Sequence, residues 1–419
     1  MTQRSLADWL SWQESLNPHA IDLGLDRVHE VAARLSFEPP TDAVFTVAGT
    51  NGKGSTASFL EYLMAANGRS TGVYMSPHLV RYNERVRVDG IPVPDRRLVA
   101  AFETVEAVRG DVPLTYFEYG TLAAMVIFGE TECRAWILEV GLGGRLDAVN
   151  VIDPDYSLIT TVALDHQEWL GRTMDAIAAE KAGILRPAKP AFYGDEPCPE
   201  AILSRARDLG AGLHCYGRDY DYETGEDTWT WRGESVELVG LPQPDVADGA
   251  QLRNLSLALA AIEIFDPALL QRPAVDRALL AERPAGRFQV VEREHQWILD
   301  VAHNPQAARV LCDRLRHPEP RATTAVFGLL ATKQADAVLQ EIASVVDRWI
   351  VCSMPGCRAV SAQDLAATLA GIGSSVIDTA ETPEQGFDLA ASVTGRGDRI
   401  LVCGSFHMVG PALRWLGLY

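Results

Sequence analysis

A glycine-rich segment that carries one lysine and two hydroxyls has the clearest chemistry in this sequence. The short β-branched and aromatic run Val44–Val47 leads into Gly49-Thr50-Asn51-Gly52-Lys53-Gly54-Ser55-Thr56, and the apolar run Ala57–Leu63 that follows is typical of a helix. A strand, a glycine loop and a helix N-terminus in this order direct backbone N–H groups at phosphate oxygens. Lys53 adds a point charge for the terminal phosphates. The segment therefore predicts a nucleotide phosphate site.

The segment departs from the common G-x-x-x-x-G-K-[ST] pattern at two positions. Val47 stands where the first glycine is expected, and Gly54 stands where the hydroxyl is expected. A flexible glycine turn with a solvent-exposed lysine is therefore an alternative interpretation. The preceding strand, together with Ser55 and Thr56, favours phosphate binding by a shorter class of loop.

Composition and charge limit the possible partners. The chain has 419 residues, a formal net charge of −19 and 47% hydrophobic residues, which predicts a globular protein of two domains. The negative charge argues against nonspecific binding to nucleic acid or anionic membranes. We find no apolar run long enough for a transmembrane helix, no signal peptide at the N-terminus, and no C-x-x-C pair among the cysteines. We expect a cytoplasmic protein whose partners are small molecules.

Strands alternate with helices along most of the chain, which predicts an α/β fold with a mostly parallel sheet. A proline and glycine break at Arg283–Arg287 is a candidate hinge, and it divides the chain into domains of residues 1–285 and 286–419. Between Tyr216 and Val239, alternating residues predict a small antiparallel excursion. Helices are expected over 6–16, 117–128, 173–182 and 252–265, and strands over 44–47, 71–75, 135–140, 158–163, 297–301, 325–330, 349–353, 375–378 and 399–403.

Polar residues stand at the ends of several predicted strands, where α/β proteins usually bind ligands. Glu139 ends an apolar strand and resembles the carboxylate that holds Mg²⁺ in many nucleotide-binding proteins. Ser76 and His166 follow other strands, although a serine at a strand end is more often a helix cap, and a single histidine is more often an ordinary polar residue. Asp300 also ends a strand, and Asn304-Pro305 after it is typical of a turn.

Two further segments give weaker signals. Lys181 lies near the end of a predicted helix and, taken alone, is typical of an exposed helix lysine. Gly141-Leu142-Gly143-Gly144-Arg145 is rich in glycine but lacks the G-x-G-x-x-G spacing, so no NAD site is predicted.

Taken in order, these pieces resemble the Mur ligase superfamily of ATP-dependent amide-forming ligases. Within it they resemble the folate branch, the dihydrofolate and folylpolyglutamate synthases. The resemblance runs from about residue 18 to residue 410. It rests on the segments Gly49–Ser55, Ser76–Leu79, Arg81–Arg85, Phe117–Tyr119, Leu138–Ala148, Asp165-His166, Glu180–Ile184, Gly286–Phe288, Asp300–Pro305 and Gly404–His407.

The resemblance implies an N-terminal P-loop ATPase domain of the Mur ligase type and a C-terminal Rossmann-like domain that binds glutamate. It implies ATP, two Mg²⁺ sites and a carbamylated lysine at Lys181. The implied ATP contacts are Thr50, Asn51, Gly52, Lys53, Gly54, Ser55, Asn254, Arg287 and Asp300. The implied metal ligands are Ser76, Glu139, His166 and Lys181, and the implied catalytic residues are Lys53, His166 and Lys181. The implied dihydropteroate contacts are Ile21, Asp22, Leu23, Tyr116, Phe117, Glu118, Leu146, Asp147 and Ala148, and the implied glutamate contacts are His303 and Ser405.

The implied activity joins L-glutamate to 7,8-dihydropteroate and to reduced folates through an acyl phosphate. The three segments that match dihydropteroate contacts favour a bifunctional enzyme, and the resemblance implies a monomer. Two alternatives stay open from the sequence: a monofunctional folylpolyglutamate synthase, and a regulatory P-loop NTPase that joins nothing.

Overall fold

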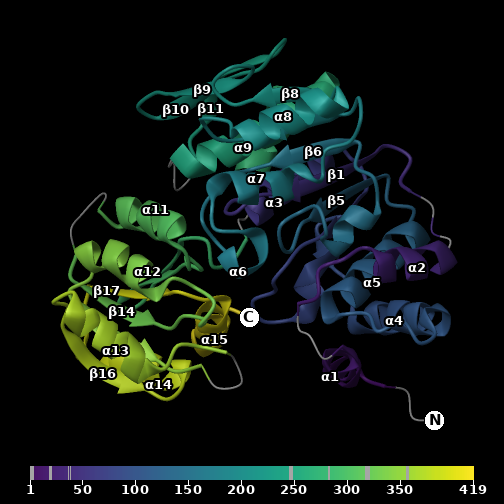
Figure 1. Ribbon diagram of the computed structural model, residues 1–419. Coiled ribbons are helices and arrows are strands. Elements are labelled where there is room, and N and C mark those ends of the chain that lie inside the picture. The colour runs from purple at the N-terminus through teal and green to yellow at the C-terminus, as the bar shows by residue number, and fades with distance from the viewer. Residues whose placement is uncertain are drawn as a thin grey trace. The chain divides into compact units, whose positions relative to one another are not determined.

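The computed structural model describes residues 4–17, 21–35, 37, 39–244, 249–281, 284–316, 321–354 and 358–419. The chain divides into two compact units, Met1–His78 with Tyr82–Glu282, and Leu79–Arg81 with Arg283–Tyr419. Each unit is an α/β structure (Figure 1). The start of the candidate hinge, Arg283, lies outside the described residues.

The first unit is built on a mostly parallel sheet, which confirms the predicted fold class. Its strand order is β4-β3-β2-β5-β1-β6-β7-β8, in which β3 is antiparallel to both of its neighbours, β2 and β4, and the other pairs are parallel. The strands are β1 (Ala43–Ala48), β2 (Thr71–Tyr74), β3 (Val86–Val88), β4 (Ile91–Pro92), β5 (Ala135–Glu139), β6 (Tyr156–Ile159), β7 (Pro190–Tyr193) and β8 (Gly212–Cys215).

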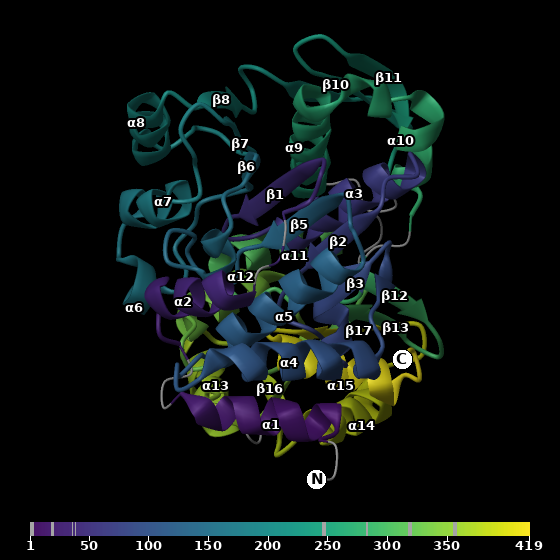
Figure 2. The same cartoon turned by 90° about the vertical axis from the view of Figure 1, so that its right-hand side faces the viewer.

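Helices cover both faces of this sheet, so its central strands β1 and β5 are buried along their whole length. In β1, Val44 and Ala48 pack into one hydrophobic cluster, and Phe45 and Val47 pack into the other. Figure 2 shows α1, α4 and α5 layered side by side. The first cluster contains residues from α1 (Leu6–Leu16), α2 (Asp26–Leu35), α4 (Asp95–Arg109), α5 (Tyr116–Glu130), α6 (Gln167–Leu170), α7 (Met174–Ala182) and α8 (Glu200–Leu209), and the second from α3 (Lys53–Ala66), α9 (Gly249–Phe265) and α10 (Arg272–Leu279).

A small antiparallel sheet confirms the predicted excursion. It contains β9 (Asp221–Thr224), β10 (Thr228–Arg232) and β11 (Glu237–Pro242). Trp229 and Trp231 alternate with polar residues along β10, and both are fully buried in the second cluster. The alternation in the sequence therefore reflects one buried face.

The second unit contains a sheet of order β12-β13-β17-β14-β15-β16, in which only β12 is antiparallel. Helices α11, α12 and α13 contribute to the cluster on one face, and α14 and α15 to the cluster on the other. The elements are β12 (Gln289–Glu292), β13 (Gln296–Leu299), α11 (Pro305–Leu315), β14 (Thr323–Phe327), α12 (Ala335–Ile342), β15 (Arg348–Cys352), α13 (Ala362–Gly371), β16 (Val376–Ala380), α14 (Pro383–Val393), β17 (Arg399–Cys403) and α15 (Phe406–Trp415).

Several strand predictions were wrong in their extent; the strand predicted over 325–330, for example, is observed at Thr323–Phe327. The apolar pattern predicts a strand over 158–163, whereas β6 ends at Ile159. The next residues, Thr160 and Thr161, bind the glycine loop instead of continuing the sheet.

In the part of the chain that the structure describes, no helix is both long enough and apolar enough to cross a membrane.

Candidate active site

The glycine loop joins the end of β1 to the start of α3. Gly52 precedes the helix with a φ of +87°, a left-handed conformation that favours glycine. As the N-cap, Gly52 has no side chain to cap the first turn of α3, which suits a helix N-terminus that binds an anion. The Lys53 ammonium donates to the carbonyl oxygens of Gly49 and Thr50, at 3.1 Å and 3.3 Å.

Two threonines after β6 hold the loop in place. Thr160 donates its hydroxyl to the carbonyl oxygen of Asn51, and the Asn51 N–H donates to Thr161 Oγ1 at 3.1 Å. The Thr50 N–H donates to the carbonyl oxygen of Thr161 at 2.8 Å. Sequence reasoning missed both threonines because they fall in a predicted strand.

Alanine at Gly52 is expected to destabilise the loop and weaken nucleotide binding. A Cβ there would lie 2.3 Å from Asn254 Oδ1, and the left-handed φ adds a strain of about 1–2 kcal/mol. Gly210→Ala is the matched control, because Gly210 has a φ of +60° and open space around it. Urea unfolding and calorimetric titration with a non-hydrolysable ATP analogue measure the two effects. We expect weaker binding only in Gly52→Ala, and equal binding by the two variants would contradict the loop assignment.

Glu139 lies beside the loop at the end of the neighbouring strand. It pairs in register with Val47, and it is only 4% exposed. The Ser76 N–H donates to Glu139 Oε2 at 3.0 Å, so the structure brings these two predicted metal ligands together. Ser76 lies in a loop and caps no helix.

The donor set fits Mg²⁺ with few protein ligands. No three His, Cys, Asp or Glu side chains gather as a metal cluster among the described residues. A carboxylate and a hydroxyl are hard oxygen donors, and Mg²⁺ keeps several of its waters when it binds proteins. Glu139 and Ser76 therefore suit a Mg²⁺ that is held partly by a nucleotide phosphate.

Lys181 is only 3% exposed, so its interpretation as a surface lysine was wrong. Burial, together with the charge of Lys53, lowers the pKa of its amine to about 7, whereas the charges of Asp165 and Asp147 oppose the shift. Four ionisable side chains from distant parts of the sequence therefore interact around the glycine loop.

His166 follows Asp165 in a left-handed conformation, with a φ of 49°. The backbone N–H of His166 donates to Asp165 Oδ1 at 2.8 Å, and the imidazole Nε2 lies 3.9 Å from the same oxygen. The imidazole is about a third exposed, so it remains accessible to a ligand. Sequence reasoning included Asp165 in a motif but assigned it no role.

Asp147 is buried in the loop that follows Glu139. Burial raises the pKa of its carboxyl to about 7, and the N–H groups of Leu142 and Val149 oppose this rise. These N–H groups donate to its two oxygens at 2.8 Å and 3.1 Å. Asp147 thereby fixes the conformation of the segment Leu146–Ala148.

A single arginine joins two of the predicted dihydropteroate segments. Arg27 Nη1 lies 2.8 Å from Asp22 Oδ2, and Arg27 Nη2 lies 3.1 Å from Glu118 Oε1. Sequence reasoning missed Arg27, which occurs on an amphipathic helix without a motif. The ring of Phe117 lies against Gly141, where a Cβ would be 2.7 Å away, and α5 contacts the turn Ala148–Val151, which begins in the third segment. The structure therefore brings the three segments together.

In the second unit, Asp300 follows β13. It is 9% exposed and accepts from the N–H groups of Phe288 and Ala302, each at 2.8 Å. Burial raises the pKa of its carboxyl, and the charges of Arg314 and Arg287 oppose this rise.

Phe406 is the common neighbour of the other predicted residues of this unit. The Arg287 guanidinium lies 5.5 Å from its ring centre, and the His303 ring lies 6.2 Å from it. Ser405 precedes Phe406 and accepts from the His407 N–H at 3.1 Å, which caps α15. Arg287, His303 and Ser405 therefore gather within the second unit.

Comparison with known proteins identifies both units. Residues 47–239 match the Mur ligase middle domain, and residues 286–406 match the Mur ligase, glutamate ligase domain. The chain is 43% identical over 409 residues to the dihydrofolate synthase/folylpolyglutamate synthase of Escherichia coli K12, covering 97% of this chain and 94% of the relative. It is 35% identical to the enzyme of the same name from Haemophilus influenzae, with 96% of each chain covered.

Solved structures agree over the whole length. Escherichia coli FolC in complex with DHPP and ADP matches with a TM-score of 0.92 and 41% identity, over 99% of this chain and 98% of that chain. A bifunctional folylpolyglutamate synthase/dihydrofolate synthase with Mn, AMPPNP and L-glutamate bound matches with a TM-score of 0.90 and 40% identity, over the same shares. The chain belongs to the dihydrofolate synthase/folylpolyglutamate synthase family of Mur ligases.

Proposed function

We propose that this chain is an ATP-dependent ligase that joins L-glutamate to 7,8-dihydropteroate and extends reduced folates with further glutamates. The observation that carries the proposal is the arrangement of the first unit. A phosphate loop, a buried carboxylate beside it and three linked acceptor segments belong to one compact unit. The relatives that share this activity in their names match almost the entire chain.

Each group of residues in the candidate active site has its own proposed role in the reaction. The loop N–H groups and Lys53 hold the phosphates of ATP, and the acceptor carboxylate attacks the γ-phosphate to form an acyl phosphate while ADP leaves. Glu139 and Ser76 hold a divalent metal, which supplies positive charge to the transferring group when bound. Asp22, Arg27 and Glu118 orient the acceptor. The amino group of glutamate then attacks the acyl carbon, and phosphate leaves.

We assign the second unit to ATP and glutamate. The proposed boundary separates residues 1–285 from a glutamate-ligase domain of residues 286–419. Arg287 and Asp300 contact the nucleotide, and His303 and Ser405 contact glutamate. Their common neighbour Phe406 supports a shared site for His303 and Ser405.

Lys181 and His166 are proposed to hold a second metal with Glu139. A lysine can serve this role after carbamylation, which replaces the cation with a carboxylate-like group. The buried position of Lys181 and its repulsion from Lys53 support the modification, because both disfavour the ammonium form.

The protein is proposed to act as a cytoplasmic monomer with small-molecule partners alone. All the cysteines in the described part of the chain are free thiols, which suits a reducing compartment. Sedimentation of the purified protein as one species of 45.7 kDa would support the monomer, and a concentration-dependent dimer would contradict it.

Phosphate release from ATP with Mg²⁺ tests the function. Each component is omitted in turn, with 7,8-dihydropteroate or tetrahydrofolate as the acceptor and L-glutamate as the amine. We expect release only when an acceptor and glutamate are both present, with both acceptors active. Phosphate release with tetrahydrofolate but not with 7,8-dihydropteroate as the acceptor would identify a monofunctional folylpolyglutamate synthase. Phosphate release that requires neither an acceptor nor glutamate would identify a regulatory NTPase.

A further inference from the structure

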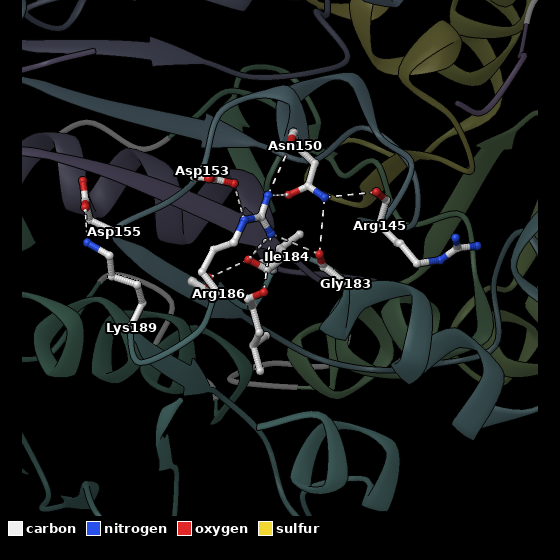
Figure 3. Close-up of polar contacts among 10 residues, drawn as sticks. Arg145, Asn150, Asp153, Asp155, Gly183, Ile184, Arg186 and Lys189 are labelled. Carbon is white, nitrogen blue, oxygen red and sulfur yellow. Dashed lines mark hydrogen bonds and ion pairs between the residues drawn. The ribbon is translucent and has the colours of Figure 1, made fainter. Parts of the chain in front are cut away.

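The guanidinium of Arg186 lies where two segments of the first unit meet (Figure 3). Its Nη1 donates to the carbonyl oxygens of Gly183, Ile184 and Leu185, at 3.3, 3.1 and 3.4 Å. Its Nη2 donates to the side-chain and main-chain oxygens of Asn150, at 2.9 and 3.3 Å. Arg186 therefore binds the segment after Lys181 and the segment after Asp147 at the same time.

Two more residues join these segments. Asp153 accepts a hydrogen bond from Arg186 Nε, so all three nitrogens of the guanidinium have a partner. The Asn150 amide donates to the carbonyl oxygens of Arg145 and Gly183, at 3.0 and 3.3 Å, and Asn150 is only 5% exposed. Figure 3 shows Arg186 and Asn150 pointing toward one another between the two segments.

Glycines allow the segments to touch through their backbones. A Cβ at Gly144 would lie 2.9 Å from the carbonyl oxygen of Glu180 and 3.2 Å from Lys181 Cα. A Cβ at Gly183 would lie 2.2 Å from Arg145 Cβ. The Arg145 N–H also donates to the carbonyl oxygen of Glu180 at 2.8 Å. The glycine-rich segment after Glu139 thus serves close packing against the end of α7.

We infer that Arg186, together with Asn150, is a positioning residue that holds Lys181 in register with the loop of Asp147. The inference rests on the proposed function, in which these two segments serve the metal and the acceptor. The segment around Gly144 also packs directly against Lys181 Cα, so a shift of either segment displaces Lys181 relative to Asp147. A planar guanidinium binds several acceptors in one fixed geometry, which an ammonium group does not reproduce.

The test compares Arg186→Lys with Lys189→Gln. Lys189 lies on the same segment, but it is about half exposed and pairs only with Asp155, at 2.9 Å, among the residues drawn in Figure 3. Arg186→Lys is expected to lower kcat by about 10- to 100-fold, because a mutation far from the chemistry that slightly misplaces the reacting groups has effects of this size. The KM for 7,8-dihydropteroate should rise, while the KM for L-glutamate stays unchanged. Lys189→Gln should match the wild type in all three constants.

A second measurement, of acceptor binding, is made without metal and without nucleotide. Calorimetric titration of the metal-free protein with 7,8-dihydropteroate should give a Kd about tenfold higher for Arg186→Lys than for the wild type. Asn150→Ala should show the same change, and the loss in the double variant should be smaller than the sum of the two single losses, because the contact between Arg186 and Asn150 is lost in both single variants. A purely structural role would lower the unfolding midpoint and leave this Kd unchanged.

The outcomes separate the inference from the proposed function. Wild-type constants in Arg186→Lys, or additive losses in the double variant, would overturn the inference. If Arg186→Lys fails to fold, the Kd of Asn150→Ala decides: a raised value supports the inference and an unchanged value rejects it. A wild-type protein without acceptor-dependent phosphate release would instead reject the proposed function.

Discussion

Replacing Lys53 with alanine is expected to lower acceptor-dependent phosphate release by at least about 100-fold, because a preorganised charge on the transferring phosphoryl group is lost. In the structure its ammonium donates to Gly49 and Thr50 of its own loop. The variant should therefore keep its fold, with a loss of about 1 kcal/mol for each hydrogen bond removed. Steady-state phosphate release and circular dichroism of the same samples check the two parts.

The matched control for this variant is Lys189→Ala, which removes an exposed lysine from the same unit. It should retain full turnover. Wild-type activity in Lys53→Ala would refute the phosphate-loop assignment. A loss of turnover that follows loss of the folded circular dichroism spectrum would refute the catalytic explanation.

Replacing Lys181 with alanine is expected to have the second-largest effect, a loss of kcat of about 100-fold that a short carboxylate partly restores. The substitution removes the side chain that is proposed to become a carbamate beside the metal. Added acetate or formate can occupy the space and supply carboxylate oxygens, which are hard ligands for Mg²⁺. Phosphate release measured over a range of acetate and Mg²⁺ concentrations tests this.

The same additive should not help Lys53→Ala, since that variant lacks a positive charge rather than an oxygen ligand. The fold of Lys181→Ala should persist, because burial opposes the charged amine in the wild type. Full activity of Lys181→Ala without any additive would eliminate the metal role. Loss of activity without carboxylate rescue would leave Lys181 a charge-stabilising role and contradict carbamylation.

The sequence by itself determined the features that depend on neighbouring residues. The order of strand, glycine loop and helix predicted the turn at Gly52, because a left-handed residue before a helix favours glycine. The α/β alternation predicted the parallel sheets, and the alternation around Trp229 and Trp231 predicted the small antiparallel sheet. Glu139 was predictable at a strand end, because an apolar run that stops at a carboxylate marks the edge of a buried sheet.

Only the tertiary structure decided which side chains are buried and which distant segments meet. Lys181 has the local pattern of an exposed helix lysine, and its burial depends on packing against the glycine-rich segment around Gly144. Arg27 and Arg186 belong to no motif, and each has a partner that lies far away in sequence, Glu118 for Arg27 and Asn150 for Arg186. Burial and long-range hydrogen bonds arise when separate elements pack together, so periodicity and spacing within one segment carry no record of them.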